Sequence, residues 1–445
     1  MIPRYTRKEM GHVWSDANRY QKWLDVELAA ADSLAEAGLL PKDAAALLHS
    51  RAKVDADRIN EIETRVKHDV IAFTMAVAES IGDPNVARWL HYGMTSNDVV
   101  DTAQALLVRD ASHIIERDLV IFGEVLDIRA HEFRHTPQIG RTHGIHAEPI
   151  TFGLKIANWF AENQRNIARF REAAHTMEFG KISGAVGNAS HLGPEIEEKI
   201  CQKLGLHVTP VATQVIQRDR HAQYLSVLAL IAASLEKIAL EIRHLQRTEV
   251  REAEEHFGNE QRGSSIMPHK RNPVTSEQIC GLARVVRGNM VAAYENIALW
   301  HERDISHSSV ERVILPDSTI LVDYMLSKMT QLVSQMRVFP ERMLSNLEST
   351  QGLVFSGTLL QDLVEKGMPR DDAYKAVQEN AMASWESDTS FRERVGRDSR
   401  LTKYLSPKEL EHAFDLKRQL RYVDKIFDRV FGEHPAGERG VANKA

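Results

Sequence analysis

Cysteine is nearly absent from this chain, which has only Cys201 and Cys280 among its 445 residues. Two isolated cysteines supply neither a disulfide framework nor a metal-ligand spacing, so disulfide-stapled domains and cysteine-based zinc sites are excluded. We expect both side chains to be small buried hydrophobic groups. Low cysteine usage is consistent with a reducing compartment, and we expect a cytoplasmic protein.

Long apolar runs are also missing. The uncharged run at 222–235 is shorter than the roughly 20 residues that span a bilayer, and His221 and Glu236 flank it. The first residues carry charges where a secretory signal has an apolar segment. We therefore expect neither a membrane span nor export, and we interpret the run as part of a core helix.

Charge of one sign does not dominate the composition. The chain has 56 basic and 62 acidic residues, giving a net charge of −6. This balance indicates neither a nucleic-acid partner nor a membrane-surface partner. With 43% hydrophobic residues the chain can bury a substantial core, and its length suggests two or three domains.

Strand signals are scarce, and several long stretches lack both Gly and Pro. The longest such stretch is 211–257, and 94–122, 154–179 and 289–315 also exceed an average helix of about 11–12 residues. Apolar residues recur in the first stretch at alternating spacings of four and three: Tyr224, Leu228, Ile231, Leu235, Ile238, Ile242 and Leu245. The pattern predicts an all-α protein with a long helical bundle, in which any sheet is a minor hairpin. The apolar seam must meet neighbouring helices within or between subunits.

One loop combines conformationally special residues with many polar side chains. Residues 263–273 read Gly-Ser-Ser-Ile-Met-Pro-His-Lys-Arg-Asn-Pro, in which Gly263 frees the backbone while Pro268 and Pro273 stiffen it. The hydroxyls and cations between them suit an active-site loop. The alternative interpretation is an ordinary Gly/Ser/Pro-rich turn.

This loop resembles the shared loop of the fumarase/aspartase superfamily, enzymes that eliminate a group beta to a carboxylate and release fumarate. At position 269 this chain has His, where fumarases typically have Gly and argininosuccinate lyases Gln. Matching segments run from Arg4 to about Arg312, whereas the tail after Gly432 is unmatched. Further strings resemble the adenylosuccinate lyase family: His-Tyr-Gly-Met-Thr-Ser-Asn-Asp (91–98), Gly-Arg-Thr-His-Gly-Ile-His-Ala-Glu-Pro (140–149) and Leu-Trp-His-Glu-Arg-Asp-Ile-Ser-His-Ser-Ser (299–309).

The resemblance implies the architecture and the reaction. It implies an N-terminal helical domain at 1–98, a central long-helix domain at 99–351 that carries the catalytic loop, and a C-terminal helical domain at 352–445. It also implies a homotetramer with active sites shared between subunits, and neither a metal nor an organic cofactor. The implied substrates are small succinylated purine nucleotides of purine biosynthesis: adenylosuccinate, cleaved to AMP and fumarate, and the succinylated aminoimidazole carboxamide ribotide (SAICAR).

Elimination of this kind needs a base, an acid and cations that stabilise a dianionic intermediate. The resemblance implies that Ser264 is the base and that His143 is the acid, oriented by Glu277. Lys270 is implied to stabilise the serine alkoxide and to hold the carboxylate that becomes fumarate. His68 is implied to contact the substrate phosphate or to assist catalysis.

The remaining candidates are substrate-binding residues, each at a position that matches the family. Thr95 and Ser96 are implied to hold a carboxylate, although a helix N-cap explains them equally well. Arg303 and Arg312 are implied to lie near the nucleotide phosphate and ribose, for which bidentate Arg contacts are suited. The full set is Arg4, Tyr5, Lys67, Asp69, His91, Thr95, Ser96, Gln214, Ser265, Arg271, Asn272, Arg303, Ser308 and Arg312.

Two alternatives stay open. The chain could be another lyase of the superfamily, such as an argininosuccinate lyase or a carboxymuconate cycloisomerase. It could also be a catalytically silent structural homologue. For any single Ser, His or Arg, a solvated or structural role is the ordinary expectation. The combination of Ser264, His143, Lys270 and Glu277 favours an enzyme.

Overall fold

The computed structural model describes residues 1–258 and 266–432 of the chain. Ser264 and Ser265, predicted as the base and a substrate contact, lie outside the described residues, as does the unmatched tail after Gly432. Within the described ranges, no helix is long and apolar enough to cross a membrane. The apolar run at 222–235 lies inside a helix, as expected.

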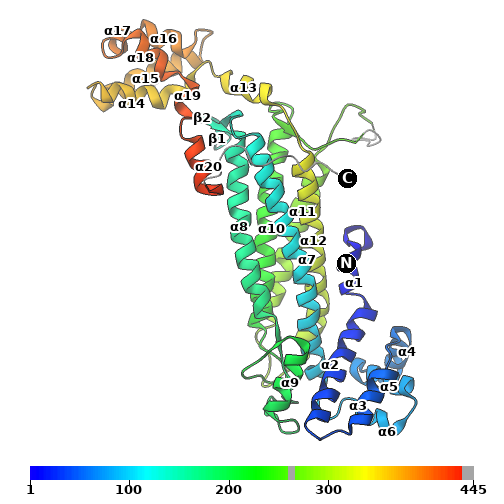
Figure 1. Ribbon diagram of the computed structural model, residues 1–445. Coiled ribbons are helices and arrows are strands. Elements are labelled where there is room, and N and C mark those ends of the chain that lie inside the picture. Colours follow the sequence, from blue (N-terminus) through cyan, green and yellow to red (C-terminus); the bar gives the residue numbers. More distant parts are fainter. Residues whose placement is uncertain (259–265, 433–445) are drawn as a thin grey trace. The chain divides into compact units, whose positions relative to one another are not determined.

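Long helices dominate the described part of the chain (Figure 1). They are α7 (Ser96–Glu132), α8 (Phe152–Thr176), α10 (Asp219–Gln246), α11 (Val274–Glu295) and α12 (Ser306–Gln335). Hydrogen bonds link them in pairs, for example the buried one between Ser112 of α7 and Tyr224 of α10 at 2.9 Å. Asn289 of α11 donates to Ser318 of α12 at 3.0 Å. The predicted all-α class with a long-helix bundle is confirmed.

Shorter helices precede, connect and follow the long ones. Before and between them lie η1 (Pro3–Tyr5), α1 (Lys8–Val13), α2 (Asp16–Glu36), α3 (Lys42–Arg51), α4 (Ala56–Val66), α5 (Asp69–Ile81), α6 (Pro84–Ala87) and α9 (Pro194–Leu204). After them come α13 (Pro340–Glu348), η2 (Leu353–Phe355), α14 (Ser356–Glu365), α15 (Arg370–Trp385), α16 (Phe391–Arg397), α17 (Ser399–Thr402), α18 (Pro407–Ala413), α19 (Leu416–Gln419) and α20 (Val423–Phe431).

The chain divides into two compact units, which are described separately. The first unit comprises residues 1–121, 165–237 and 278–329. The second comprises residues 122–164, 238–277 and those from 330 onward. Each of the long helices contributes residues to both units. The predicted domain boundaries after residues 98 and 351 stay a prediction.

Helix α10 contains the predicted seam but is shorter than the uninterrupted stretch at 211–257. All the seam residues from Tyr224 to Leu245 are buried, so the apolar stripe is covered by neighbouring helices of the same chain. Residues 211–218 stay outside the helix because tertiary contacts bind their backbone groups. The backbone N–H of Ile216, for example, donates to the Asp101 carboxylate at 2.8 Å. This non-helical segment supplies pocket residues.

The prediction of one uninterrupted helical stretch over 289–315 is wrong, because α11 ends at Glu295 and α12 begins at Ser306. The Asp304 carboxylate accepts hydrogen bonds from the backbone N–H groups of Trp300 (2.8 Å) and Ser306 (2.9 Å). Such side-chain acceptors compete with the helical hydrogen-bond ladder and cap the next helix. The break at 296–305 places Arg303 beside the pocket.

Strands are few and short in the described chain, as predicted. Strands β1 (Pro137–Thr142) and β2 (Ile145–Thr151) form an antiparallel hairpin with a shift in register between Ile139 and Arg141. His143 and Gly144 form its turn with φ values of 55° and 79°, the conformation that a two-residue primed turn requires. The other pairs are β3 (Phe179–Gly180) with β4 (His207–Val208), parallel, and β5 (Ala253–Glu254) with β6 (Arg337–Val338), antiparallel.

An aromatic cluster fixes the helices that carry the first candidate site residues. Tyr20 and Trp23 of α2 and Phe73 of α5 are buried, with Trp23 edge-on to Phe73 at a centroid distance of 5.5 Å. Buried aromatic pairs of this geometry stabilise a contact beyond their apolar area. The cluster anchors α5 against α2 and so fixes the turn that precedes α5.

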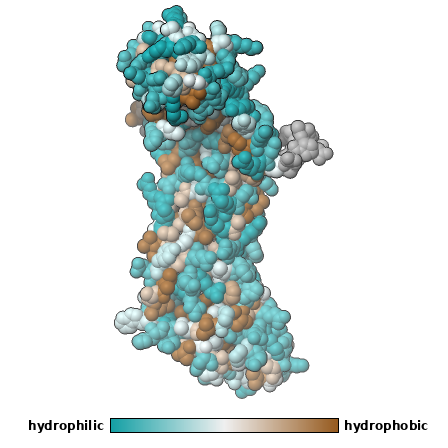
Figure 2. Space-filling view, turned by 90° about the vertical axis from the view of Figure 1, so that its left-hand side faces the viewer, coloured by the Kyte–Doolittle hydropathy of each residue, from teal (hydrophilic) through white to brown (hydrophobic). Residues whose placement is uncertain are grey.

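The two cysteines are buried, as expected, and burial raises the pKa of the Cys201 thiol to about 12. Several large apolar side chains remain exposed on the long helices, among them Val285, Val291 and Tyr294 of α11. Figure 2 shows one face of the molecule, where apolar residues lie exposed among hydrophilic ones. Exposed apolar side chains mark an interface where they form a contiguous patch, whereas single ones are common on any protein surface.

Candidate active site

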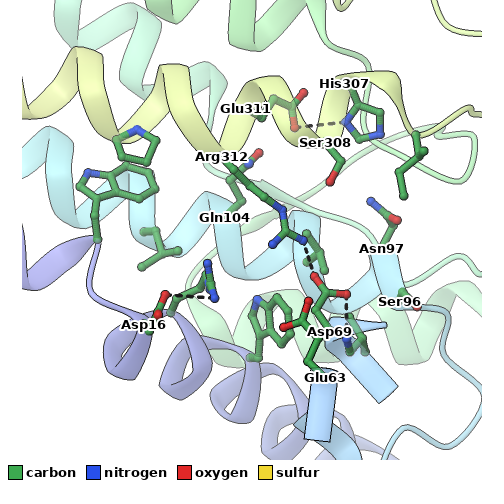
Figure 3. Close-up of a pocket in the computed structure, with 18 of the residues that line it drawn as sticks. Asp16, Glu63, Asp69, Ser96, Asn97, Gln104, His307, Ser308, Glu311 and Arg312 are labelled. Atoms are coloured by element: carbon green, nitrogen blue, oxygen red, sulfur yellow. Dashed lines mark hydrogen bonds and ion pairs between the residues drawn. The ribbon is translucent and has the colours of Figure 1, made fainter. Parts of the chain in front are cut away.

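The first unit contains a pocket with a volume of about 880 Å³ (Figure 3). Its walls come from the N-terminal helices, the start of α7, the segment before α10, and the start of α12 with the segment before it. Many predicted site residues line it: Lys67, His68, Asp69, Thr95, Ser96, Gln214, Arg303, Ser308 and Arg312. The fold therefore brings together residues that lie up to 245 positions apart in the sequence.

A sharp connection between α4 and α5 presents Lys67 and His68. Lys67 ends α4 in the left-handed region at φ 56°, a conformation that costs energy for a residue with a side chain. His68 caps α5, because its Nδ1 accepts a hydrogen bond from the backbone N–H of Ile71 at 3.4 Å. In the neutral ring Nε2 then carries the proton. His68 can therefore donate to a bound anion.

An ion pair joins two predicted binding residues, Asp69 of α5 and Arg312 of α12 (Figure 3). Burial alone would raise the pKa of the Asp69 carboxyl, but the hydrogen bond and charge of Arg312 hold it below its usual value. The Arg312 side chain keeps 47% of its surface exposed. Its remaining N–H groups are therefore available to an oxyanion in the pocket.

Thr95 and Ser96 lie at the start of α7, and the Thr95 N–H donates to the Asp98 carboxylate at 2.8 Å. Asp98 forms a fully buried ion pair with Lys181 at 2.6 Å. The Lys181 ammonium also donates to the backbone carbonyl of Gln214 at 3.0 Å. One buried cation thus supports both the hydroxyl pair and Gln214 from behind the pocket.

A second buried network lies beneath Arg303. Arg218 donates to Asp101 at 2.7 Å and to Glu311 at 2.8 Å. Burial would raise the pKa of Glu311, but the Arg218 charge and a hydrogen bond from His307 hold it well below its usual value. Asp101 is likewise kept ionised, because Arg218 offsets the effect of burial on its pKa.

His91 is not among the residues that line the pocket. It has a left-handed backbone (φ 60°), and its Nδ1 lies 2.7 Å from the buried Glu27 carboxylate. Burial would lower the pKa of the imidazole, but the hydrogen bond and charge of Glu27 raise it overall. Glu27 therefore favours the imidazolium form.

Arg4 and Tyr5 do not line the pocket either. Tyr5 packs edge-on against Tyr324 of α12, with ring centroids 5.3 Å apart. Arg7, just beyond them, forms ion pairs with the carboxylates of Asp118 and Asp323. These contacts fix the N-terminal segment on α7 and α12.

The other predicted residues belong to the second unit. His143 is exposed at the tip of the β1–β2 hairpin, and Glu277 is exposed in the first turn of α11. No hydrogen bond or ion pair joins these two described side chains within the chain, so their predicted pairing stays a prediction. Lys270 and Arg271 are also exposed, and Asn272 is partly exposed.

Described residues next to and at the end of the predicted catalytic loop form hydrogen bonds and an ion pair. The Glu255 carboxylate accepts hydrogen bonds from the Ser276 N–H at 2.7 Å and the Ser276 hydroxyl at 2.6 Å, so it caps α11. Gln246 donates to the Arg271 carbonyl at 3.1 Å, and Arg271 pairs with Glu254 at 2.8 Å. These contacts tie the end of α10 to the start of α11.

One group of side chains among the described residues could hold a metal ion. His175, Glu178 and His207 have ligand atoms that all lie within 4.8 Å of one another. Two imidazoles and a carboxylate are ligands that transition metals accept. None of the three lines the pocket or belongs to the predicted site.

Sequence reasoning missed the buried supports of the pocket. Asp98 and His307 lie within the family-like segments 91–98 and 299–309, so they could have been predicted as site residues. No local signal marks Asp101, Lys181 or Arg218, because a buried charge is recognised only with its partner. Arg218 and Asp101, for instance, are 117 positions apart in the sequence.

Comparisons with known proteins identify the family of the chain. The family model described as Lyase matches residues 4–288. The chain belongs to this lyase family, within the fumarase/aspartase superfamily. A second model, described as Adenylosuccinate lyase C-terminus, matches residues 352–430. The adenylosuccinate lyase of Bacillus subtilis (strain 168) is 50% identical over 430 residues, which cover 97% of this chain and 99% of that protein. The chain is thus a homologue of adenylosuccinate lyase.

Solved structures show the same fold. The crystal structure of a fumarate lyase from Mesorhizobium sp. BNC1 has a TM-score of 0.89 and 26% identity, covering 98% of this chain and all of that one. The 3-carboxy-cis,cis-muconate lactonizing enzyme from Pseudomonas putida has a TM-score of 0.88 and 30% identity, covering 96% of each chain.

Proposed function

We propose that this lyase eliminates fumarate from adenylosuccinate to give AMP, and from SAICAR in the parallel step of purine synthesis. The observation that carries the proposal is the pocket of the first unit, whose lining includes Lys67, His68, Arg303, Ser308 and Arg312. These side chains offer cationic and hydroxyl donors to the phosphate and carboxylates of a succinylated nucleotide. The full-length similarity to an adenylosuccinate lyase supports the same substrate.

Two of the acidic residues that line the pocket are already paired with cations. Asp69 is paired with Arg312, and Glu311 is paired with the buried Arg218. A carboxylate already bound to a guanidinium contributes little repulsion toward a second anion. Lys67 and Arg303 lie on the same lining and form no ion pair that would neutralise them in the described structure.

In the proposed reaction, Ser264 removes a proton from the succinyl carbon next to a carboxylate. The electron pair moves into that carboxylate, and the resulting dianion is stabilised by Lys270 and Asn272. The carbon–nitrogen bond then breaks, the electrons pass to the purine nitrogen, and His143 supplies its proton. Fumarate and AMP are the products, and no electron acceptor is needed.

We propose that the active enzyme is a homotetramer in which one chain supplies the pocket and others supply the catalytic groups. The exposed positions of His143, Lys270 and Glu277 in the second unit support this arrangement. Exposed apolar residues on the long helices also support it, such as Val291 of α11, whose relative exposure is 55%. We further propose a cytoplasmic location, which the low cysteine content supports.

A substrate panel tests the proposed reaction. Purified enzyme is mixed separately with adenylosuccinate, argininosuccinate and carboxymuconate, and each conversion is followed by absorbance. We expect turnover with adenylosuccinate and none with the other two compounds. Ser264→Ala should abolish turnover while the mass of the assembly, measured by light scattering, stays unchanged. Undiminished activity in that variant, or turnover of argininosuccinate instead, contradicts the proposal.

Mixing two inactive variants tests the shared site. His143→Ala and Arg303→Ala change the second and the first unit, respectively. If different chains build one site, subunit exchange creates some sites with both native residues, and activity returns in the mixture. Mixing two preparations of the same variant is the matched control and should restore nothing. No recovery after proven subunit exchange contradicts sharing.

A further inference from the structure

His307 lies at the floor of the pocket between two arginines. It belongs to the first turn of α12 and only 2% of its surface is exposed. Arg303 donates from Nε to His307 Nε2 at 3.2 Å. Nη2 of the buried Arg218 lies 3.3 Å from His307 Nδ1. The imidazole therefore touches a candidate phosphate-binding residue on one edge and the buried ion cluster on the other.

The hydrogen bonds determine which nitrogen of His307 carries the proton. Arginine has donors and no acceptor, so Nε2 accepts from Arg303 and is unprotonated. Nη2 of Arg218 has two N–H groups, and the carboxylates of Asp101 and Glu311 each accept from it at 3.0 Å, so Nδ1 is not required as an acceptor for Arg218. The proton then lies on Nδ1, where the Glu311 carboxylate is 3.3 Å away (Figure 3). Glu311 thus holds the neutral Nδ1–H tautomer, as orienting carboxylates do for catalytic histidines. The lone pair of Nε2 points at Arg303.

The charges around His307 come from several elements. Asp101 of α7 and Glu311 of α12 supply two negative charges, and Arg218 and Arg303 supply two positive ones. His221 of α10 is neutral, because burial and the Arg218 charge lower its pKa to about 4. Both carboxylates bind Arg218 directly, and among the described residues no carboxylate forms an ion pair with Arg303.

Arg303 is held instead by neutral acceptors. His307 binds its Nε, and the side-chain oxygen of Gln214 accepts from its Nη1 at 3.3 Å. Two contacts on one planar group fix both its position and its plane. Burial lowers the pKa of Arg303, and the Arg218 charge lowers it further although the Asp101 charge opposes this. A bound anion would supply the missing negative charge.

We propose that His307 is a positioning residue that aims the Arg303 guanidinium at the phosphate of the substrate without neutralising it. Glu311 fixes the tautomer of His307, and His307 fixes Arg303. The identity of the anion rests on the proposed function. His307 itself need not touch the substrate, so its effect is expected in the binding of phosphate-bearing ligands.

The experiment is a double-mutant cycle read by binding of AMP, which carries the phosphate and no carboxylate. His307→Leu should weaken AMP binding by about 10- to 100-fold, the loss expected for a hydrogen bond to a charged group. In an Arg303→Ala background the same change should have little further effect, because the group that it positions is gone. Binding of fumarate, which has carboxylates only, should change little in His307→Leu.

Conservative variants separate positioning from folding. The amide oxygen of Gln in His307→Gln can reach the place of Nε2, whereas that of Asn in His307→Asn reaches only the place of Nδ1. We therefore expect the Gln variant to bind AMP more tightly than the Asn variant, and to raise KM less at similar kcat. If His307→Leu does not fold, the AMP affinities of the Gln and Asn variants still test whether His307 positions Arg303.

Several outcomes would overturn the inference while leaving the proposed function intact. One is that His307→Leu weakens AMP binding by the same factor in wild type and in Arg303→Ala. Another is that His307→Gln and His307→Asn bind AMP equally well. A third is that His307→Leu weakens fumarate binding and leaves AMP binding unchanged. The last result would assign Arg303 to a carboxylate instead. If the wild-type enzyme fails to cleave adenylosuccinate at all, the proposed function fails, and the AMP cycle still reports on His307.

Discussion

Replacing Lys181 with methionine would leave the Asp98 carboxylate buried and without its cation. Both side chains have 0% exposure, and their charged atoms lie 2.6 Å apart. In Lys181→Met, Asp98 would keep only its hydrogen bonds from the N–H groups of Thr95 (2.8 Å) and Gly184 (3.2 Å) in the described structure. Removing one partner of a buried ion pair costs about 3–5 kcal/mol, because an uncompensated charge remains in the interior.

The matched control is a surface ion pair of the same kind. Lys203 and Glu36 lie 2.7 Å apart with side-chain exposures of 31% and 53%. Because exposed pairs contribute only about 0–1 kcal/mol, Lys203→Met should change stability little. Urea unfolding at fixed enzyme concentration, followed by circular dichroism, measures both changes. The double variant Lys181→Met with Asp98→Asn should recover part of the loss, since it removes the buried charge.

A functional consequence accompanies the loss of stability. Lys181 also donates to the Gln214 carbonyl, and Gln214 contacts Arg303. We therefore expect the folded fraction of Lys181→Met to bind AMP more weakly than wild type. If Lys181→Met costs no more than Lys203→Met, the reasoning about the buried pair is refuted.

Three further predictions concern the pocket and its surroundings. Asp69→Asn should raise KM for adenylosuccinate by about tenfold, because Arg312 loses its charged partner; steady-state kinetics measure this, and an unchanged KM would contradict it. Glu27 raises the pKa of His91 in the folded protein above the value of about 6.5 in the unfolded chain. The pair should therefore stabilise the fold fully below about pH 6.5, and this stabilisation should be lost as the pH rises through the folded-state pKa of His91. Urea unfolding across pH 6 to 9 should therefore show a decline in wild type that is smaller in Glu27→Gln, and equal slopes would refute the assignment. Dialysis against a chelator should leave kcat unchanged, since His175, Glu178 and His207 do not line the pocket; loss of activity that zinc restores would contradict this.

The helical class of the fold could be predicted because the apolar pattern of α10 repeats along one face. The apolar residues from Tyr224 to Leu245 are buried, so the local sequence pattern was enough to predict a packed helix. The break between α11 and α12 could not be found in the same way. It depends on the Asp304 carboxylate binding backbone N–H groups on both sides, and the residues 289–315 contain no Gly or Pro to signal it.

The candidate site was predictable where contiguous residues carry the chemistry. Lys67, His68 and Asp69 are neighbours in sequence, and all three line the pocket. The supports behind them were not predictable, because their partners are distant: Lys181 reaches Asp98 across 83 positions. Single buried charges such as these look like ordinary surface residues until the fold places their partners beside them.

Product stoichiometry with adenylosuccinate tests the central claim most directly. Purified enzyme is incubated with a known amount of adenylosuccinate, and fumarate and AMP are measured together by chromatography. The account predicts that they form in equal amounts, at a rate that Ser264→Ala and His143→Ala each abolish. Absence of fumarate, or fumarate formed equally well by both variants, would contradict it.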